Sequence, residues 1–183
     1  MRIIGGKYRS RVLAEFAGDD VRPTSDRAKE SLFNILALKM YGARVLDLFA
    51  GSGALGLEAL SRGAKEVVFN DFSKDSLAIV KKNLSALKIA INSEEAKVCQ
   101  YDFLSCLDVV KGQFDIIFLD PPYRFDYGTK ALERIAQKGL LSENGIVINE
   151  RDIPFEGEIA GLEKYDERKY GKTYITFFRR VKE

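Results

Sequence analysis

Strand-forming and helix-forming segments alternate along most of this 183-residue chain, and that alternation constrains its fold more than any other feature. Short apolar runs bounded by turn residues predict strands, and apolar residues at helical spacing predict helices. The predicted strands are 44–49, 66–70, 96–100, 114–119 and 145–149, and the predicted helices are 27–40, 54–62, 73–87 and 128–137. Strands that alternate with helices form βαβ units, so we expect a mostly parallel sheet with helices on both faces.

The two ends of the chain depart from this alternation. Residues 162–170 and 173–179 predict an antiparallel strand pair across a Gly-Lys turn. At the start, two β-prone pieces flank a Gly-Gly turn and predict a hairpin. We therefore expect residues 1–24 to form a hairpin extension and residues 25–183 to form one α/β domain, a length that suits a single core.

The residue types that are missing narrow the chemistry. The chain has no histidine and only two cysteines, Cys99 and Cys106. This composition excludes Ser-His-Asp and Cys-His catalysis and every histidine-ligated metal site, and two cysteines alone do not build a zinc site, so we expect no metal. Few, unpatterned cysteines, no apolar run of membrane-spanning length and no signal-peptide stretch predict a cytoplasmic protein.

Positive charge is concentrated near the start of the chain. Residues 1–44 hold nine Lys and Arg against five Asp and Glu, a balance of +4, while the remainder holds 20 against 22, a balance of −2. In a strand, the alternating Lys7, Arg9 and Arg11 would share one face. With Arg22 they predict a surface that contacts RNA; the alternative is a hairpin edge protected by charge.

A glycine loop follows the first predicted strand. Three glycines match the dinucleotide pattern G-x-G-x-x-G: Gly51, Gly53 and Gly56. Asp71 ends the next predicted strand, 20 residues after Gly51, where an acid binds ribose hydroxyls in dinucleotide-binding proteins. Taken alone, this pattern fits a nicotinamide-dependent oxidoreductase, and close packing of helix on strand is the alternative reason for the glycines.

Asp47, four residues before the glycines, favours a different cofactor. A carboxylate repels a pyrophosphate but attracts a cationic amine. S-adenosylmethionine has no phosphate, and it carries a sulfonium and an α-ammonium group. Phe72 and Asp102 complete the predicted pocket, as a face for adenine and an acceptor for its amino group. The alternatives for these three residues are, in turn, a carboxylate tied to loop amides, a core aromatic side chain and a helix cap.

The segment Asp120-Pro121-Pro122-Tyr123 follows the strand predicted at 114–119. Two prolines remove two backbone donors and fix φ, so the chain leaves the sheet as a stiff loop. In parallel sheets, ligands bind at this end of the strands. The segment offers a carboxylate, prolyl carbonyls and a flat ring, a set that suits a planar group with an amino substituent. Stacking needs the ring of Tyr123 and not its hydroxyl; the alternative is a proline-rich turn after a core strand.

These motifs resemble the RsmD-like bacterial methyltransferases, which methylate the N2 amino group of a guanine in small-subunit ribosomal RNA. The resemblance covers nearly the whole chain and rests on residues 1–6, 22–24, 33–34, 45–53, 120–123 and 170–173. The glycine loop and the Asp-Pro-Pro-Tyr box occur in many amino-group methyltransferases, whereas residues 22–24 are more specific to this family. The chain departs from the family at Asp71, where the family favours glutamate.

The resemblance implies a Rossmann-like class I S-adenosylmethionine-dependent methyltransferase fold with a seven-stranded sheet, formed by residues 25–183. It implies a cofactor site made by Thr24, Asp47, Phe49, Gly51, Gly53, Asp71, Phe72, Asp102 and Phe103. The Asp120 carboxylate and the Pro121 carbonyl would accept the two N–H bonds of the target amine, and Asp120 either takes its proton or only orients it. The implied partner is ribosomal RNA or a small-subunit assembly particle, bound by a monomer.

Other activities stay open on the sequence. Amino-group methyltransferases that act on DNA adenine or on a protein glutamine share the box, but more often carry Asn at its first position. Asp in that position favours guanine, because a carboxylate accepts from both the N1–H and the N2–H of its edge. A nicotinamide oxidoreductase and an RNA-binding module with a vestigial pocket are the remaining alternatives.

Overall fold

The computed structural model describes residues 1–16, 26–123 and 125–182. A seven-stranded sheet with the order β3-β2-β1-β4-β5-β7-β6 forms its framework. The strands are β1 (Arg44–Asp47), β2 (Glu66–Asn70), β3 (Ala96–Cys99), β4 (Phe114–Leu119), β5 (Leu141–Arg151), β6 (Leu162–Tyr170) and β7 (Thr173–Arg180). Strands β1 to β5 are parallel, and β7 runs antiparallel between β5 and β6.

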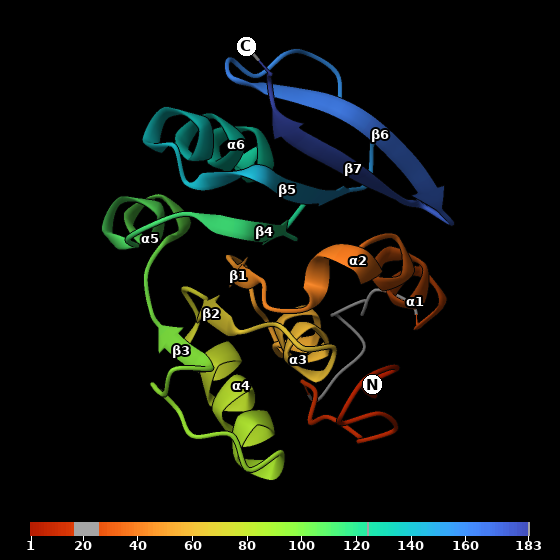
Figure 1. Cartoon of the computed structure of the whole chain (residues 1–183), viewed down its shortest axis with the longest axis vertical. Helices are drawn as coiled ribbons and strands as arrows, with labels where there is room; N and C mark the ends of the chain where they lie inside the picture. The colour runs from red at the N-terminus through yellow and green to blue at the C-terminus, as the bar shows by residue number, and fades with distance from the viewer. Residues whose placement is uncertain (17–25, 124, 183) are drawn as a thin grey trace.

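Helices cover both faces of the sheet (Figure 1). One face carries α1 (Asp26–Ile35), α2 (Ala37–Met40), α3 (Ala54–Ser61) and α4 (Lys74–Ala86), and the other carries α5 (Phe103–Val109) and α6 (Tyr127–Lys138). Each face has its own apolar core, one around Phe33 and Phe118 and the other around Phe114 and Leu132. Since β4 contributes side chains to both cores, its sequence is a nearly continuous apolar run.

The predicted fold class is confirmed, and most predicted elements are present within a few residues. The strands at 66–70 and 114–119 have the predicted bounds. The single helix predicted at 27–40 is wrong, because the chain turns at Leu36 and divides it into α1 and α2. Helix α5 was not predicted, since seven residues are too few to display the helical period.

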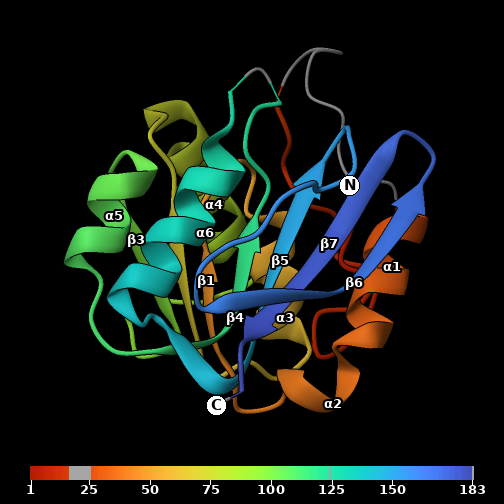
Figure 2. The ribbon, with the colours of Figure 1, turned by 90° about the horizontal axis from the view of Figure 1, so that it is seen from above.

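The sheet brings the carboxyl ends of several strands to a single edge. The carboxyl ends of β1, β2, β4 and β5 share this edge because these strands are parallel. Strand β6 is antiparallel to β7, which is antiparallel to β5, so the turn between β6 and β7 reaches the same edge (Figure 2). The loops after β1 and β4 and the β6–β7 turn therefore stand around one space.

The start of the chain is a closed loop and not a pair of strands. Its arms pair through one antiparallel bridge, between Arg2 and Val12. Residues Lys7 and Arg9 lie in a turn, so the argument that they share a strand face with Arg11 is wrong. All three side chains are nevertheless exposed. The predicted hairpin is thus reduced to one bridge that closes a basic loop.

The Gly-Gly pair in this loop serves a close approach to α3. Gly6 has a φ of +78°, and a Cβ there would lie 1.8 Å from the Ser61 carbonyl oxygen. Buried Glu58 on α3 accepts from the amides of Ile4 and Gly5, each at 2.8 Å. The side chains of Ile3 and Leu13 are buried in the apolar core that also contains residues of α1. The loop therefore belongs to the body of the domain; the predicted boundary after residue 24 lies outside the described residues.

Candidate active site

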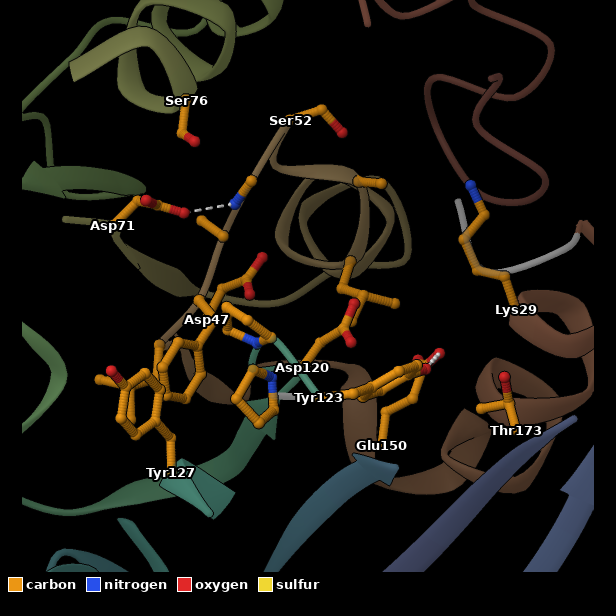
Figure 3. Close-up of a pocket in the computed structure, with 18 of the residues that line it drawn as sticks. Lys29, Asp47, Ser52, Asp71, Ser76, Asp120, Tyr123, Tyr127, Glu150 and Thr173 are labelled. Atoms are coloured by element: carbon orange, nitrogen blue, oxygen red, sulfur yellow. Dashed lines mark hydrogen bonds between the residues drawn. The ribbon is translucent and has the colours of Figure 1, made fainter. Parts of the chain in front are cut away.

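A cavity of about 1960 Å³ opens at the edge where the strand ends meet. Small-molecule pockets usually measure about 300–1,000 Å³, so this one has room for two ligands side by side. Figure 3 shows Asp71 on one side of it, Tyr123 and Glu150 on the other, and Asp47 and Asp120 between them. We call the part around Asp47, the glycine loop and Asp71 the glycine-loop end, and the part around Asp120, Tyr123, Glu150 and Thr173 the tyrosine end.

Asp71 holds the glycine loop in place. Its Oδ2 accepts from the Gly51 amide at 2.9 Å, and its Oδ1 accepts from the Ser73 amide at 2.8 Å. Gly51 has a φ of +55°, which favours glycine, and no atom lies within 4 Å of where its Cβ would be. The backbone of the loop is therefore bare toward the cavity, and a ligand can approach it closely.

The third glycine of the pattern has a packing role. A Cβ on Gly56 would lie 2.3 Å from the Phe69 ring, so only glycine lets α3 pack this closely on β2. The Gly56 amide also donates to the Oδ2 of Asp47 at 3.0 Å. The alternative of close packing therefore holds for Gly56, and the alternative of a bond to a loop amide holds for Asp47.

Asp47 nonetheless has the burial and the few hydrogen bonds that suit a carboxyl group for binding a cation. It is 2% exposed, and the Gly56 amide is its one hydrogen-bond partner among the described residues. Burial raises the pKa of Asp47 to about 7, and the nearby Asp71 carboxylate adds to this effect while the Gly56 amide opposes it. A cationic group in the cavity would restore its charge and gain a desolvated ion pair.

Phe72 and Asp102 line the cavity as predicted. The Phe72 ring is 76% exposed, so the alternative that it belongs to the core is wrong. Asp102 is the N-cap of α5 and accepts from the amides of Leu104 and Ser105 at 3.1 and 3.0 Å. The helix-cap alternative for Asp102 is therefore correct, and hydrogen bonding to Ser105 holds its pKa below the usual range.

Three aromatic rings pack together beside these residues. Phe103 lies 5.5 Å from Phe49 and 4.8 Å from Tyr127, measured between ring centroids. The sequence predicted Phe49 and Phe103 for the site and missed Tyr127, which begins α6 and has no local motif around it. Together they make an apolar wall suited to a flat heterocycle.

The glycine-loop end fits S-adenosylmethionine better than a dinucleotide. It offers buried and half-exposed carboxylates, bare loop backbone and aromatic faces. The basic side chains that line the cavity come from α1, from the end of β6 and from the β6–β7 turn: Arg27, Lys29, Lys169 and Lys172. Within the described residues, no Lys or Arg follows β1, β2 or β3 into this end, so no basic side chain there offsets the repulsion between its carboxylates and a pyrophosphate.

At the tyrosine end, the Asp-Pro-Pro-Tyr box emerges directly after β4. Pro121 is buried, and Tyr123 is 48% exposed and lines the cavity, so part of it is open to a ligand. The Tyr123 hydroxyl donates to the Oε1 of Glu150 at 3.3 Å, and Thr173 lies near the same hydroxyl. Glu150 lies near the end of β5 and is 7% exposed.

Asp120 and Tyr123 both hold protons more tightly than usual at this end. Burial raises the pKa of Asp120 well above its ordinary value, and Glu150 and Asp47 raise it further. Burial also raises the pKa of Tyr123, with added repulsion from Glu150 and Asp120. Asp120 is therefore suited to accept a proton from a bound group, whereas Tyr123 keeps its own.

Sequence reasoning missed Glu150 and Thr173. Glu150 directly follows the strand predicted at 145–149, so the rule that selected Asp120 after its strand would also have selected it. Thr173 and Tyr170 were noted only as part of the family resemblance; the Tyr170 hydroxyl lies 2.7 Å from the Ser31 hydroxyl, which ties the β6–β7 turn to α1.

Several predictions concern other parts of the chain. Arg22 and Thr24 lie outside the described residues. Cys99 and Cys106 do not line the cavity. In residues 1–16, 26–123 and 125–182, no group of three metal-binding side chains is arranged around a common point. No helix in the same ranges combines the length and the apolar character needed to cross a membrane.

Comparison with known proteins identifies close relatives. The family model described as Conserved hypothetical protein 95 matches residues 1–179. Ribosomal RNA small subunit methyltransferase D of Haemophilus influenzae is 40% identical over 158 residues, which cover 84% of this chain and 81% of that protein. Putative rRNA methyltransferase YlbH of Bacillus subtilis is 35% identical over 185 residues, which cover 98% and 99%.

A solved structure gives the same result. The putative methyltransferase yhhF from Escherichia coli matches with a TM-score of 0.86 and 34% identity, covering 98% of this chain and 97% of that one. The Rossmann-like class I methyltransferase fold is thereby confirmed. With a family model that spans nearly the whole chain and relatives well above 30% identity, the chain belongs to the RsmD-like methyltransferase family.

Proposed function

We propose that this protein transfers the methyl group of S-adenosylmethionine to the exocyclic N2 amino group of a guanine in small-subunit ribosomal RNA. The observation that carries the proposal is the pairing of the two cavity ends. An acidic glycine-loop end without basic side chains lies against a tyrosine end whose side chains accept protons and stack. The names of the relatives support ribosomal RNA as the substrate class.

The glycine-loop end would hold the cofactor. Asp47 is placed to pair with its ammonium group, and Asp71 to accept from its ribose hydroxyls. Phe72 and Phe103 offer faces to the adenine, and Asp102 an acceptor for its amino group; Phe49, Gly51 and Gly53 form the adjoining wall, and Thr24 remains part of the prediction. When bound, S-adenosylmethionine supplies an electrophilic methyl group. Because the methyl group is already electrophilic, the proposed reaction requires no metal ion.

The tyrosine end would orient the nucleophile. A guanine amine is a poor nucleophile because its lone pair is delocalised into the ring, so its nitrogen must be held in line with the methyl. Positioning of this kind removes about 7–11 kcal/mol of barrier in favourable cases. The Pro121 carbonyl and the Asp120 carboxylate accept the two N–H bonds, and Asp120 takes the proton that the methylated nitrogen loses. Pro122 stiffens the loop, and the base stacks on Tyr123.

The acceptors at this end favour guanine over adenine. Guanine presents N1–H and N2–H donors on one edge, and carboxylates accept from both. Adenine presents an acceptor at N1, which an ionised carboxylate repels. DNA-adenine and protein-glutamine methylation therefore find less support, and so does a nicotinamide oxidoreductase, since the carboxylates of the glycine-loop end repel a pyrophosphate.

RNA would also contact the basic loop at the start of the chain, whose tip packs beside Ser61 at the end of α3. Lys7, Arg9 and Arg11 are exposed there, and Arg22 belongs to the same prediction. The target base must lie in a loop or be unstacked to reach Tyr123. Ribosomal RNA or an assembling subunit is then the partner, encountered in the cytoplasm by a monomeric enzyme.

Mass spectrometry of ribosomal RNA nucleosides tests the proposal. RNA from cells without the gene should lack one N2-methylguanosine of the small subunit, and the purified protein with S-adenosylmethionine should restore it. Naked RNA and isolated subunits serve as parallel substrates. An Asp120→Ala protein is the matched control and should restore nothing. Restoration of a different methylated nucleoside, or of none, would refute the proposal.

A further inference from the structure

The hydroxyl of Tyr123 is held by residues that lie far from the Asp-Pro-Pro-Tyr box in sequence. It donates to the Oε1 of Glu150 at 3.3 Å, and Thr173 lies near it. These neighbours come from β5 and from the first residue of β7, two strands that pair side by side. Figure 3 shows the Tyr123 ring lying along Glu150, with Thr173 beyond it. Stacking alone requires none of these contacts.

Glu150 is costly to keep where it is. Its side chain is 7% exposed, and its charge lies close enough to Asp120 to raise the proton affinity of that group. Two carboxylates close together and largely removed from water repel each other, so one of them tends to bind a proton or a cation. Glu150 lines the cavity and accepts there from the Tyr123 hydroxyl, a contact that gives it a place in the site.

We propose that Glu150 is a positioning residue for methyl transfer, whose carboxylate holds the Tyr123 hydroxyl and fixes the plane of the ring on which the target base lies. The proposal rests on the proposed function and deepens it. Glu150 does not contact the base in this scheme. It acts through Tyr123, and a ring that is 48% exposed depends on such a contact because few neighbours pack on it.

The need for a fixed plane follows from the chemistry. The amine nitrogen must lie in line with the bond from sulfur to methyl, and small errors in its position cost rate. A tyrosine fixed only at its Cβ can rotate about two side-chain bonds. Holding the hydroxyl oxygen at the far end restricts the rotation about Cα–Cβ, which moves the whole ring. The hydroxyl hydrogen prefers to lie in the plane of the ring, so its direction toward Glu150 also disfavours rotation about Cβ–Cγ, which tilts that plane.

The proposal reverses an expectation based on stacking. If only the ring mattered, Tyr123→Phe would be nearly silent. If Glu150 orients the ring, Tyr123→Phe and Glu150→Ala break the same contact and should cause the same loss. A merely structural role for Glu150, in β5 beside Ile175 of β7, would be independent of the Tyr123 hydroxyl.

A double-mutant cycle on single-turnover methyl transfer, at saturating RNA and cofactor, separates these cases. We expect Tyr123→Phe and Glu150→Ala each to lower the rate by about tenfold, as for one lost hydrogen bond to a charged group. The double variant should be no slower than the slower single variant. Glu150→Gln should stay within about threefold of the wild type, because its amide oxygen still accepts from the hydroxyl. Cofactor affinity should not change.

Glu143→Ala is the matched control, an exposed glutamate at the other end of β5, and should transfer at the wild-type rate. Multiplicative losses in the double variant would overturn the proposal, and so would a fully active Tyr123→Phe protein. The latter result is decisive even if Glu150→Ala does not fold. A wild-type protein that methylates no RNA would instead refute the proposed function, and this proposal with it.

Discussion

The two ends of the cavity hold their functional side chains in different ways. At the glycine-loop end, carboxylates accept from backbone amides close in sequence: Asp102 from a residue two positions away, Asp47 from one nine away and Asp71 from one 20 away. At the tyrosine end, side chains hold side chains: Tyr123 and Glu150 are 27 residues apart, and Ser31 and Tyr170 are 139 apart. One end is built by local loops and the other by the assembled sheet.

Because of this difference, we expect a substitution at one end of the cavity to leave the function of the other end intact. A side chain fixed by its own loop can be replaced without disturbing the other end, since the partner amides stay with the loop. The cofactor and the chemical step are thereby assigned to different residues. Substitutions at each end, and a change of pH, test whether cofactor binding and the chemical step depend on different residues.

Asp120→Ala should have the largest effect. It removes the group that accepts the amine proton, so the single-turnover rate should fall about 10²-fold or more. Binding of S-adenosylhomocysteine, followed by calorimetry, should stay close to that of the wild type. A variant that lost cofactor binding to the same extent as rate would show that the two ends are one unit.

Asp47→Ala should act on the cofactor. Loss of a charge-assisted hydrogen bond costs about 1.5–3 kcal/mol, which is about a 10- to 100-fold loss of affinity. Calorimetric titration with S-adenosylmethionine measures it, and NAD serves as the comparison ligand. Tight binding of NAD that survives the substitution would contradict the assignment of this end.

The pH dependence of cofactor affinity should follow Asp47. Its pKa is raised to about 7 in the ligand-free protein, so below that pH the group is neutral and must release a proton before it pairs with an ammonium group. Affinity should therefore fall by at most about tenfold per pH unit as pH drops below 7, and stay level above it. Titrations at pH 6, 7 and 8 measure this.

Asp47→Asn is the control for that experiment. An amide has no proton to release, so this variant should bind weakly and with little dependence on pH. Equal pH dependence in both proteins would assign the titration to another group, and Asp120, whose pKa is also raised, would be the first to examine.

Replacing Lys7, Arg9 and Arg11 with alanine should have the smallest effect on catalysis. Three lost phosphate contacts should reduce the slope of log K against log salt for RNA by about 2, because fewer counterions are released. The matched control removes three exposed lysines from elsewhere on the surface: Lys111, Lys130 and Lys138. If both triple variants show the same slope, the basic loop has no special role in RNA binding.

Sequence patterns identified the glycine-loop end better than the tyrosine end for the same structural reason. Asp47, Asp71 and Asp102 belong to strand–loop–helix units, whose residues appear together in the chain. Glu150 and Thr173 reach Tyr123 only because β5 pairs with β7, and nothing near the Asp-Pro-Pro-Tyr box in sequence indicates that pairing.

The start of the chain differs from its predicted shape for another reason. Alternating basic residues predicted a strand there, but contacts with α3 decide its shape: Glu58 binds two of its amides, and Gly6 passes against Ser61. Local propensity yields to such tertiary contacts. The same contacts leave the basic side chains exposed, so the prediction of RNA binding does not depend on the strand.

A cofactor titration of single-turnover methyl transfer tests the division between the two ends most directly. The Asp47→Asn and Asp120→Asn proteins are compared with the wild type at rising concentrations of S-adenosylmethionine, with RNA in excess. We expect the Asp47→Asn rate to approach that of the wild type once the cofactor saturates. The Asp120→Asn rate should stay at least about 10²-fold low at every concentration. A saturating cofactor that rescues Asp120→Asn, or that fails to rescue Asp47→Asn, would contradict the account.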